Sequence, residues 1–341
     1  MCPSVTSTWV TAILQKGLLA KSLFVTVFLA LLKKRSAEVR IVTYRELHQK
    51  SDLLPLMEQA FGWPFEPSEF EKTIKQDPRL RDGCVGFCAL DEARVVGYVG
   101  VMDLATKTVG GAVEKAGGIY GVATLPSYTR RGVCRALLDR AHEYLVEKDY
   151  RFSFLTTSPT IVAYSLYLEL GYSDVTSFPG AYKVKEKGER RTSGRERTKL
   201  DFDRMLEIYR EYVKDKTGLV VRNEAYMKML AKTLEIAAGE CITTSRGYII
   251  FKKEKKRVRI RELIACDEKE MNELVGRVED KAQNLVYARA VLDPTLRRVY
   301  RSLGFSVLEA GHGVIMVKEL TETPFNEAYS SRFYMGALDH F

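Results

Sequence analysis

The chain has 341 residues, of which 46% are hydrophobic, and a net charge of +9. This length allows two ordinary domains, and the hydrophobic share excludes a chain that stays disordered. Six cysteines without a Cys-x-x-Cys pair and only four histidines argue against a zinc site. We therefore expect a cytoplasmic protein with reduced thiols and no metal.

The first 38 residues differ from the rest of the chain. The segment 9–32 is largely apolar but is interrupted by Lys16 and Lys21, and its uncharged part, 22–32, is shorter than the roughly 20 residues of a membrane span. Three interpretations stay open: an amphipathic helix on a membrane or on the protein, a weak signal-anchor, or sequence upstream of a true start near Val39. We favour the last two equally, and membrane contact is expected only through residues 9–35.

A regular pattern of strands and helices begins at Val39. Apolar periodicity and turn residues predict strands at 39–44, 85–90, 95–104, 119–124, 152–156 and 182–184, and helices at 46–61, 68–75, 133–145 and 161–170. These elements define a first domain at 39–185. A charged, apolar-poor linker is predicted at 186–199.

Residues 200–320 have the pattern of a degenerate second copy of the first domain. Helices are predicted at 202–213, 223–237, 268–278 and 294–303, and strands at 248–251, 257–264, 285–291 and 313–317. Tyr300–Phe305 repeats the spacing of Tyr167–Tyr172. The tail, 321–341, is rich in aromatic residues, and we expect it to dock on the protein because loose tails are normally polar.

The loop between Pro126 and Val133 carries Arg130, Arg131 and Gly132 directly before a predicted helix. A helix N-terminus exposes unpaired N–H groups, and arginines with a glycine make that end suited to phosphates. The alternative is an ordinary basic turn before a surface helix. Between Ile264 and Glu268 the second copy has neither glycine nor arginine, so we expect no phosphate loop there.

The run Gly117–Leu138 resembles motif A of the GNAT superfamily of N-acyltransferases, whose loop binds the pyrophosphate of acetyl-coenzyme A. Its Arg-Arg-Gly form and the doubled domain resemble the Eis-type branch, although the sterol-carrier-like third domain of that branch is absent. The resemblance implies tandem α/β (α+β) GNAT folds, each a mixed, mostly antiparallel sheet that splays open beside its fourth strand. The implied coenzyme-binding residues are Val122, Ala123, Thr124, Thr129, Arg130, Arg131, Gly132, Val133, Cys134, Arg135 and Thr160.

The same resemblance implies the catalytic groups. A tyrosine on the helix after the fifth strand often protonates the leaving thiolate, and Tyr167 matches that position; packing is the alternative role. In the Eis type the C-terminal carboxylate reaches the active site, so we hypothesise that the Phe341 carboxylate binds or deprotonates the amine, with simple packing of the tail as the alternative. Trp63–Glu66 and Asp339 are candidates for an acidic, aromatic acceptor pocket, or for connecting and surface roles.

Two classes of function follow. The first is an acetyl-coenzyme A-dependent N-acetyltransferase acting on an amine of a small molecule, protein or peptide, without nucleic acid as a partner. The alternative is a non-catalytic acyl-coenzyme A or nucleic-acid binder that uses the basic hairpin 252–259. That hairpin has no interleaved aromatic residues, which weakens base stacking.

Overall fold

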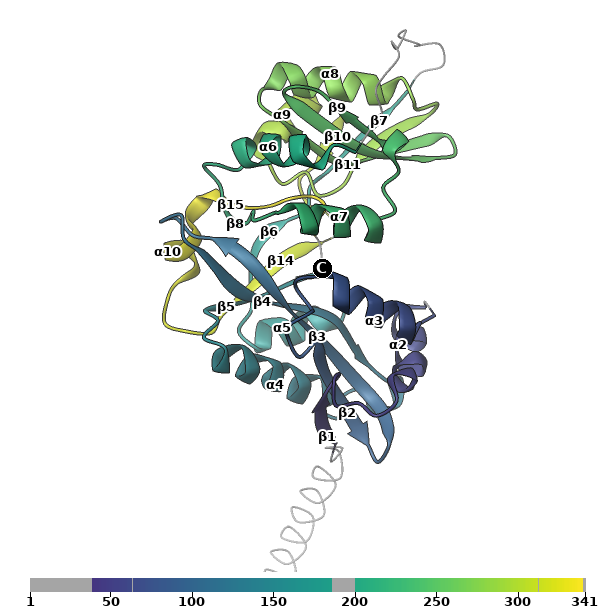
Figure 1. Cartoon of the computed structure of the whole chain (residues 1–341), viewed down its shortest axis with the longest axis vertical. Coiled ribbons are helices and arrows are strands. Elements are labelled where there is room, and N and C mark those ends of the chain that lie inside the picture. The colour runs from purple at the N-terminus through teal and green to yellow at the C-terminus, as the bar shows by residue number, and fades with distance from the viewer. Residues whose placement is uncertain (1–38, 63, 186–199, 312, 340–341) are drawn as a thin grey trace, which may run out of the picture.

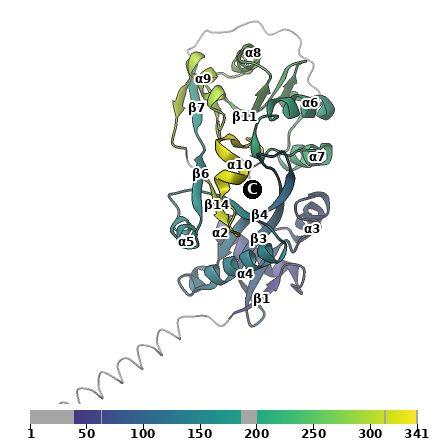
Figure 2. The same ribbon diagram turned by 90° about the vertical axis from the view of Figure 1, so that its left-hand side faces the viewer.

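The computed structural model describes residues 39–62, 64–185, 200–311 and 313–339 (Figure 1). The predictions for the N-terminal segment 1–38, for the linker 186–199, for Trp63 and for Phe341 lie outside these residues. Two halves, each built on a sheet with helices, lie end to end, and the C-terminal segment returns to the region between them (Figures 1 and 2).

The first half begins with β1 (Arg40–Thr43), the short helix η1 (Lys50–Leu53), α2 (Leu54–Phe61) and α3 (Pro67–Gln76). There follow β2 (Gly86–Asp91), β3 (Arg94–Lys107), β4 (Val113–Thr124), η2 (Pro126–Tyr128), α4 (Val133–Glu147), β5 (Phe152–Thr157), α5 (Ala163–Glu169), β6 (Ser173–Ser177) and β7 (Gly180–Val184). The prediction of a single helix at 46–61 was wrong for the residues before Leu54. Lys50 Nζ donates to the carbonyls of Tyr44, Arg45 and Leu47, which holds a turn there, and the helix starts only at Leu54.

The second half contains α6 (Phe202–Tyr212), β8 (Thr217–Leu219), α7 (Glu224–Thr233), η3 (Ala238–Glu240), β9 (Cys241–Thr243), β10 (Gly247–Glu254), β11 (Arg257–Ala265), α8 (Glu268–Glu279), β12 (Leu285–Ala288), α9 (Pro294–Ser302), β13 (Ser306–Leu308) and β14 (Val314–Glu319). The tail adds α10 (Phe325–Tyr329), η4 (Ser330–Arg332) and β15 (Phe333–Met335).

The two halves exchange strands. Within the described residues, one sheet has the order β1-β2-β3-β4-β5-β14-β6, with β8 paired to β3 and β15 paired to β8. The other sheet has the order β13-β7-β12-β11-β10-β9. The strand predicted at 182–184 was assigned to the first domain, but β7 lies between β12 and β13 of the second sheet. The strand predicted at 313–317 was assigned to the second domain, but β14 lies between β5 and β6 of the first sheet. Each half therefore needs a strand from the other, although both sheets are mixed and mostly antiparallel as expected.

The first sheet opens beside β4. The parallel pairing of β4 with β5 covers only Gly117 to Ile119. Beyond it, the β3–β4 register shifts, and Gly121 takes a left-handed conformation with a φ of 58°. A bulge with a glycine in this conformation bends its strand, so β4 turns away from β5 and leaves main-chain groups at Val122 and Thr124 beside the gap. The splay predicted at this strand is present.

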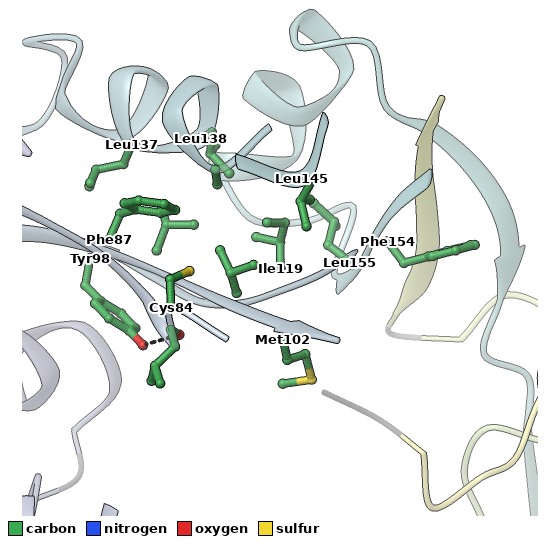
Figure 3. Packing of buried hydrophobic residues seen from close by; sticks show 14 of the residues in the cluster. Cys84, Phe87, Tyr98, Met102, Ile119, Leu137, Leu138, Leu145, Phe154 and Leu155 are labelled. Atoms are coloured by element: carbon green, nitrogen blue, oxygen red, sulfur yellow. Dashed lines mark hydrogen bonds between the residues drawn. The ribbon is translucent and has the colours of Figure 1, made fainter. Parts of the chain in front are cut away.

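Helix α4 packs very closely against this sheet. Leu137, Leu138 and Leu145 point from α4 toward the strands (Figure 3). A Cβ atom at Gly117 would come within 2.3 Å of the Leu145 side chain, so glycine is required for this close approach. The packing fixes the position of the helix N-terminus next to the end of β4.

The tail packs on both halves. β15 pairs in parallel with β8, and Tyr329 is fully buried with its hydroxyl donating to Thr106 Oγ1 at 3.0 Å. Near the end of the tail, Leu338 and Asp339 are buried. Figure 2 shows this segment in yellow between the two halves.

Candidate active site

The loop between β4 and α4 ends in an open helix N-terminus. Arg130 and Gly132 both have left-handed backbones, with φ values of 58° and 83°. Gly132 is the N-cap of α4, no side chain caps the helix, and its first turn contains no acidic residue. The first N–H groups of an uncapped helix need a partner from outside the helix, and the helix dipole favours an anion there.

A cavity of about 530 Å³ lies at this helix end, between the end of β4 and helix α5. Eight predicted coenzyme residues line it: Val122, Thr124, Thr129, Arg130, Gly132, Val133, Cys134 and Arg135. Three others do not. Ala123 is buried in the sheet, Arg131 lies over the Tyr128 ring at 5.2 Å, and the Thr160 hydroxyl is hydrogen-bonded to that of Ser158 at 2.8 Å.

Helix α5 supplies a wall of the cavity that the sequence analysis missed. Val162, Leu166 and Glu169 line the cavity from this side. Their spacing of four and three residues places them on one helical face, and this periodicity was readable in the sequence. Glu169 also forms an ion pair with Arg135 across the cavity, which leaves Arg130 as the lining arginine without a carboxylate partner among the described residues.

Tyr167 differs from its neighbouring tyrosines in having a free hydroxyl. The Tyr164 hydroxyl donates to Asp174 at 3.0 Å, and the Tyr172 hydroxyl is bonded to His142 Nε2 at 2.9 Å and to Ser153 Oγ at 2.7 Å. The Tyr167 hydroxyl has no hydrogen-bond partner among the described residues. Burial, and next the nearby Cys134, raise the pKa of Tyr167, so this phenol is protonated at neutral pH.

Cys134 lines the cavity but is not activated as a nucleophile. Burial raises the pKa of its thiol to about 11, against a smaller opposing effect of the Thr124 hydroxyl. Since the thiolate is the reactive form of cysteine, the cavity offers no ready group for forming an acyl-cysteine.

The residues proposed for the acceptor pocket are engaged elsewhere. Glu66 caps α3 by accepting from Ser68 N at 3.2 Å, and Asp339 accepts from Arg222. Asp339 also lines a separate cavity of about 230 Å³ where the tail, α7 and the edge of β3 meet. The Phe341 carboxylate lies outside the described residues, so its predicted role stays a prediction.

Arg222 holds the tail, and the sequence analysis missed it. Its guanidinium group donates to Glu262 at 2.7 and 2.8 Å and to Asp339 at 2.8 and 3.0 Å, and it lies 4.1 Å from the centre of the Tyr209 ring. Burial raises the pKa of Asp339 and Arg222 opposes this rise. The bonding of one buried cation to two carboxylates fixes the tail between the halves.

Comparisons with known proteins agree with this geometry. Residues 38–175 match the family described as an acetyltransferase (GNAT) domain, so the chain contains a GNAT acetyltransferase domain. No curated protein matches its sequence. Among solved structures, it is similar to a GCN5-related N-acetyltransferase from Kribbella flavida (18% identity, TM-score 0.61, covering 83% of this chain and 72% of the other).

Two further structures share the fold over most of the chain. They are a probable N-acyltransferase from Enterococcus faecalis (16% identity, TM-score 0.61, 83% and 72% covered) and Eis1 from Mycobacterium abscessus (16% identity, TM-score 0.56, 82% and 74% covered). The predicted GNAT domain is thus confirmed for residues 38–175, and the doubled fold is confirmed over most of the chain. At these identities the likeness establishes the fold and leaves the substrate open.

Neither a metal centre nor a membrane span is found in the part of the chain that the structure describes. Among those residues, no group of three or more His, Cys, Asp and Glu side chains is placed to hold a metal ion. No described helix is both long and apolar enough to cross a membrane.

Proposed function

We propose that this protein is an N-acetyltransferase that moves an acetyl group from acetyl-coenzyme A to a primary amine by direct transfer. The observation that carries the proposal is the open, uncapped N-terminus of α4 in a 530 Å³ cavity beside the gap between β4 and β5. The N–H groups there and Arg130 would bind the pyrophosphate, and the main chain at Val122 and Thr124 would pair with the pantetheine arm.

Tyr167 is the proposed general acid. When the amine attacks the thioester carbon, the C–S bond breaks and the coenzyme thiolate leaves with the electron pair, so it needs a proton. The support for this role is that its hydroxyl is protonated, has no partner among the described residues and lies near Cys134, which lines the cavity; Tyr167 itself is not among the lining residues. The high pKa of Cys134 favours direct transfer over an acyl-cysteine intermediate.

The first test is a thermal melt with and without acetyl-coenzyme A. A ligand present at a hundred times its dissociation constant stabilises the folded state by about 2.7 kcal/mol, and we expect a corresponding rise in melting temperature. An unchanged melting temperature with millimolar acetyl-coenzyme A would contradict the proposal.

A panel of amines, assayed for release of free thiol, then tests turnover. Small polyamines, amino sugars and peptides with a free N-terminus or lysine cover the acceptor classes. Binding of acetyl-coenzyme A without thiol release for any amine would favour the alternative, a non-catalytic acyl-coenzyme A binder.

A further inference from the structure

An arginine-lined cavity lies in the second half, where β11 and β12 part. Their parallel pairing ends at Ile260 opposite Ala288, and Arg261 and Arg289 follow directly on the two strands. A cavity of about 260 Å³ opens at this point, and Arg259 lines it together with these two arginines. Three arginines thus line one small cavity, with Arg259 and Arg261 half-buried and Arg289 exposed.

The three groups have no acidic partner. Within the described ranges, neither Arg259, Arg261 nor Arg289 forms an ion pair with a carboxylate. Arg261 donates to the Leu234 carbonyl at 2.7 Å, but its Nε atom is buried and has no hydrogen-bond partner among the described residues. Burial, and next the charge of Arg259, lower the pKa of Arg261. The cluster is therefore under like-charge repulsion and has an unused donor.

Two more deeply buried arginines of the described residues are neutralised. Arg222 bonds to two carboxylates, and Arg79 forms a bidentate pair with Asp77 at 2.8 and 3.0 Å. Two acidic side chains, Glu240 and Glu235, partly oppose the lowering of the pKa of Arg261. Glu240 is itself paired with Lys252, and neither forms an ion pair with Arg261 among the described residues. Because buried donors are normally satisfied, the unused Nε of Arg261, with two further arginines beside it that form no ion pair among the described residues, suits this cavity to an anion supplied from outside the chain.

The size and lining of the cavity indicate the kind of anion. Guanidinium groups bind phosphate oxygens in a bidentate fork, and three of them match the several oxygens of one phosphate group. Leu234 and Leu338 add an apolar wall, which suits an organic substituent on that phosphate. A small volume with no aromatic side chain among its described lining residues favours a compact ligand over a nucleic-acid strand.

We propose that this cavity is a second anion site and that it binds the phosphate group of a small organic phosphate. The site is distinct from the loop at α4. The tail forms part of its wall through Ala337 and Leu338, and the next residue, Asp339, is held by Arg222. A bound ligand would therefore hold the tail from the side opposite to Arg222, and it would slow opening of the tail.

The test is a calorimetric titration of the full chain with phenyl phosphate and, separately, with inorganic phosphate. Both titrations use a protein that carries Arg130→Gln/Arg131→Gln. These replacements remove the two arginines of the loop before α4, so that binding at the cavity is measured separately whether or not that loop binds coenzyme. We expect one site per chain, tighter binding of phenyl phosphate than of inorganic phosphate, and at least tenfold weaker binding after Arg261→Gln/Arg289→Gln. Saturation should also slow amide hydrogen exchange at residues 336–339.

The matched control is Lys253→Gln/Lys256→Gln, which removes the same charge from the β10–β11 hairpin at positions that do not line the cavity. This pair should change the affinity by less than about twofold, since exposed charges are screened by salt. Arg259→Gln alone provides a milder variant if the double replacement does not fold. The proposal is wrong if no saturable binding occurs, if both double variants weaken binding equally, or if only an oligonucleotide binds.

Discussion

The two halves place equivalent helices, α4 and α8, after equivalent strands, but the N-termini of these helices are opposite in character. α4 starts at Gly132 without a side-chain cap and with no acidic residue in its first turn. α8 starts at Asp267, whose carboxylate accepts from Glu270 N at 2.8 Å, and Glu268 and Glu270 follow in the first turn.

The difference decides which half is able to hold an anion at this position. In α8 the first N–H groups and the dipole are satisfied by the chain itself, and Arg246 pairs with Asp267. The N–H of Glu270, and next Arg246, lower the pKa of Asp267, so this cap is ionised at neutral pH. In α4 the same groups stay open. A shared fold thus has a structural helix end in one half and a candidate binding site in the other.

The largest expected effect comes from giving α4 the cap that α8 has. Gly132→Asp places a carboxylate where the pyrophosphate would lie and puts a side chain on a backbone with a φ of 83°. We expect coenzyme affinity to fall about 100-fold or more, because charge-assisted hydrogen bonds of about 1.5–3 kcal/mol each are replaced by repulsion. Calorimetric titration with coenzyme A measures the change.

The reciprocal replacement, Asp267→Gly, is the matched control. It removes the cap of α8, so the melting temperature should fall while the dissociation constant for coenzyme A stays the same. A loss of coenzyme binding in Asp267→Gly, or normal binding in a folded Gly132→Asp protein, would show that the helix ends do not differ in the way proposed.

The second prediction compares Tyr167 with Tyr300, its counterpart in the repeated motif. Tyr167→Phe removes the proposed acid, and we expect kcat to fall about 100-fold, within the range usual for general acid catalysis. The dissociation constant for acetyl-coenzyme A should change little. The rate of thiol release under saturating amine is the measurement.

Tyr300→Phe should leave this rate unchanged, since Tyr300 is buried against Phe305 with ring centres 4.9 Å apart. Equal rates for the native protein and Tyr167→Phe would assign Tyr167 to packing. The coenzyme affinity helps to separate the two roles, because removing an acid lowers kcat alone, whereas a packing defect beside the cavity also weakens binding.

Local features of the fold and site were predictable from the sequence, and long-range ones were not. The loop at Arg130–Gly132 and the helix after it are set by neighbouring residues, and the structure has them as predicted. β7 and β14 are short strands that lie between two neighbours in sheets that bring together distant parts of the chain, so their pairing depends on the whole chain. Arg222 lies 40 residues from Glu262 and 117 from Asp339, so no local pattern indicates this cluster.

The smallest expected effect is a loss of stability at acidic pH that arises from a histidine buried in the first half. α4 carries His142, which is buried and bonded to the Tyr172 hydroxyl at 2.9 Å, whereas no histidine occurs in the described part of the second half. Burial, and next the charge of Lys318, lower the pKa of His142 from 6.5 to about 4. The folded state therefore binds this proton less readily than the unfolded chain.

The sign follows from the proton count. Between about pH 6.5 and 4 the unfolded chain binds a proton that the folded state does not, so stability is complete above pH 6.5 and falls as the pH decreases. At pH 5.5 the loss should be about 1 kcal/mol, one pH unit below the unfolded pKa. Urea unfolding at pH 7.5 and 5.5 measures it, and His142→Gln should remove this part of the pH dependence even if the variant is less stable at both pH values. If the native protein and His142→Gln lose the same stability between these pH values, the dependence arises from other groups and the first half has no acid-sensitive core.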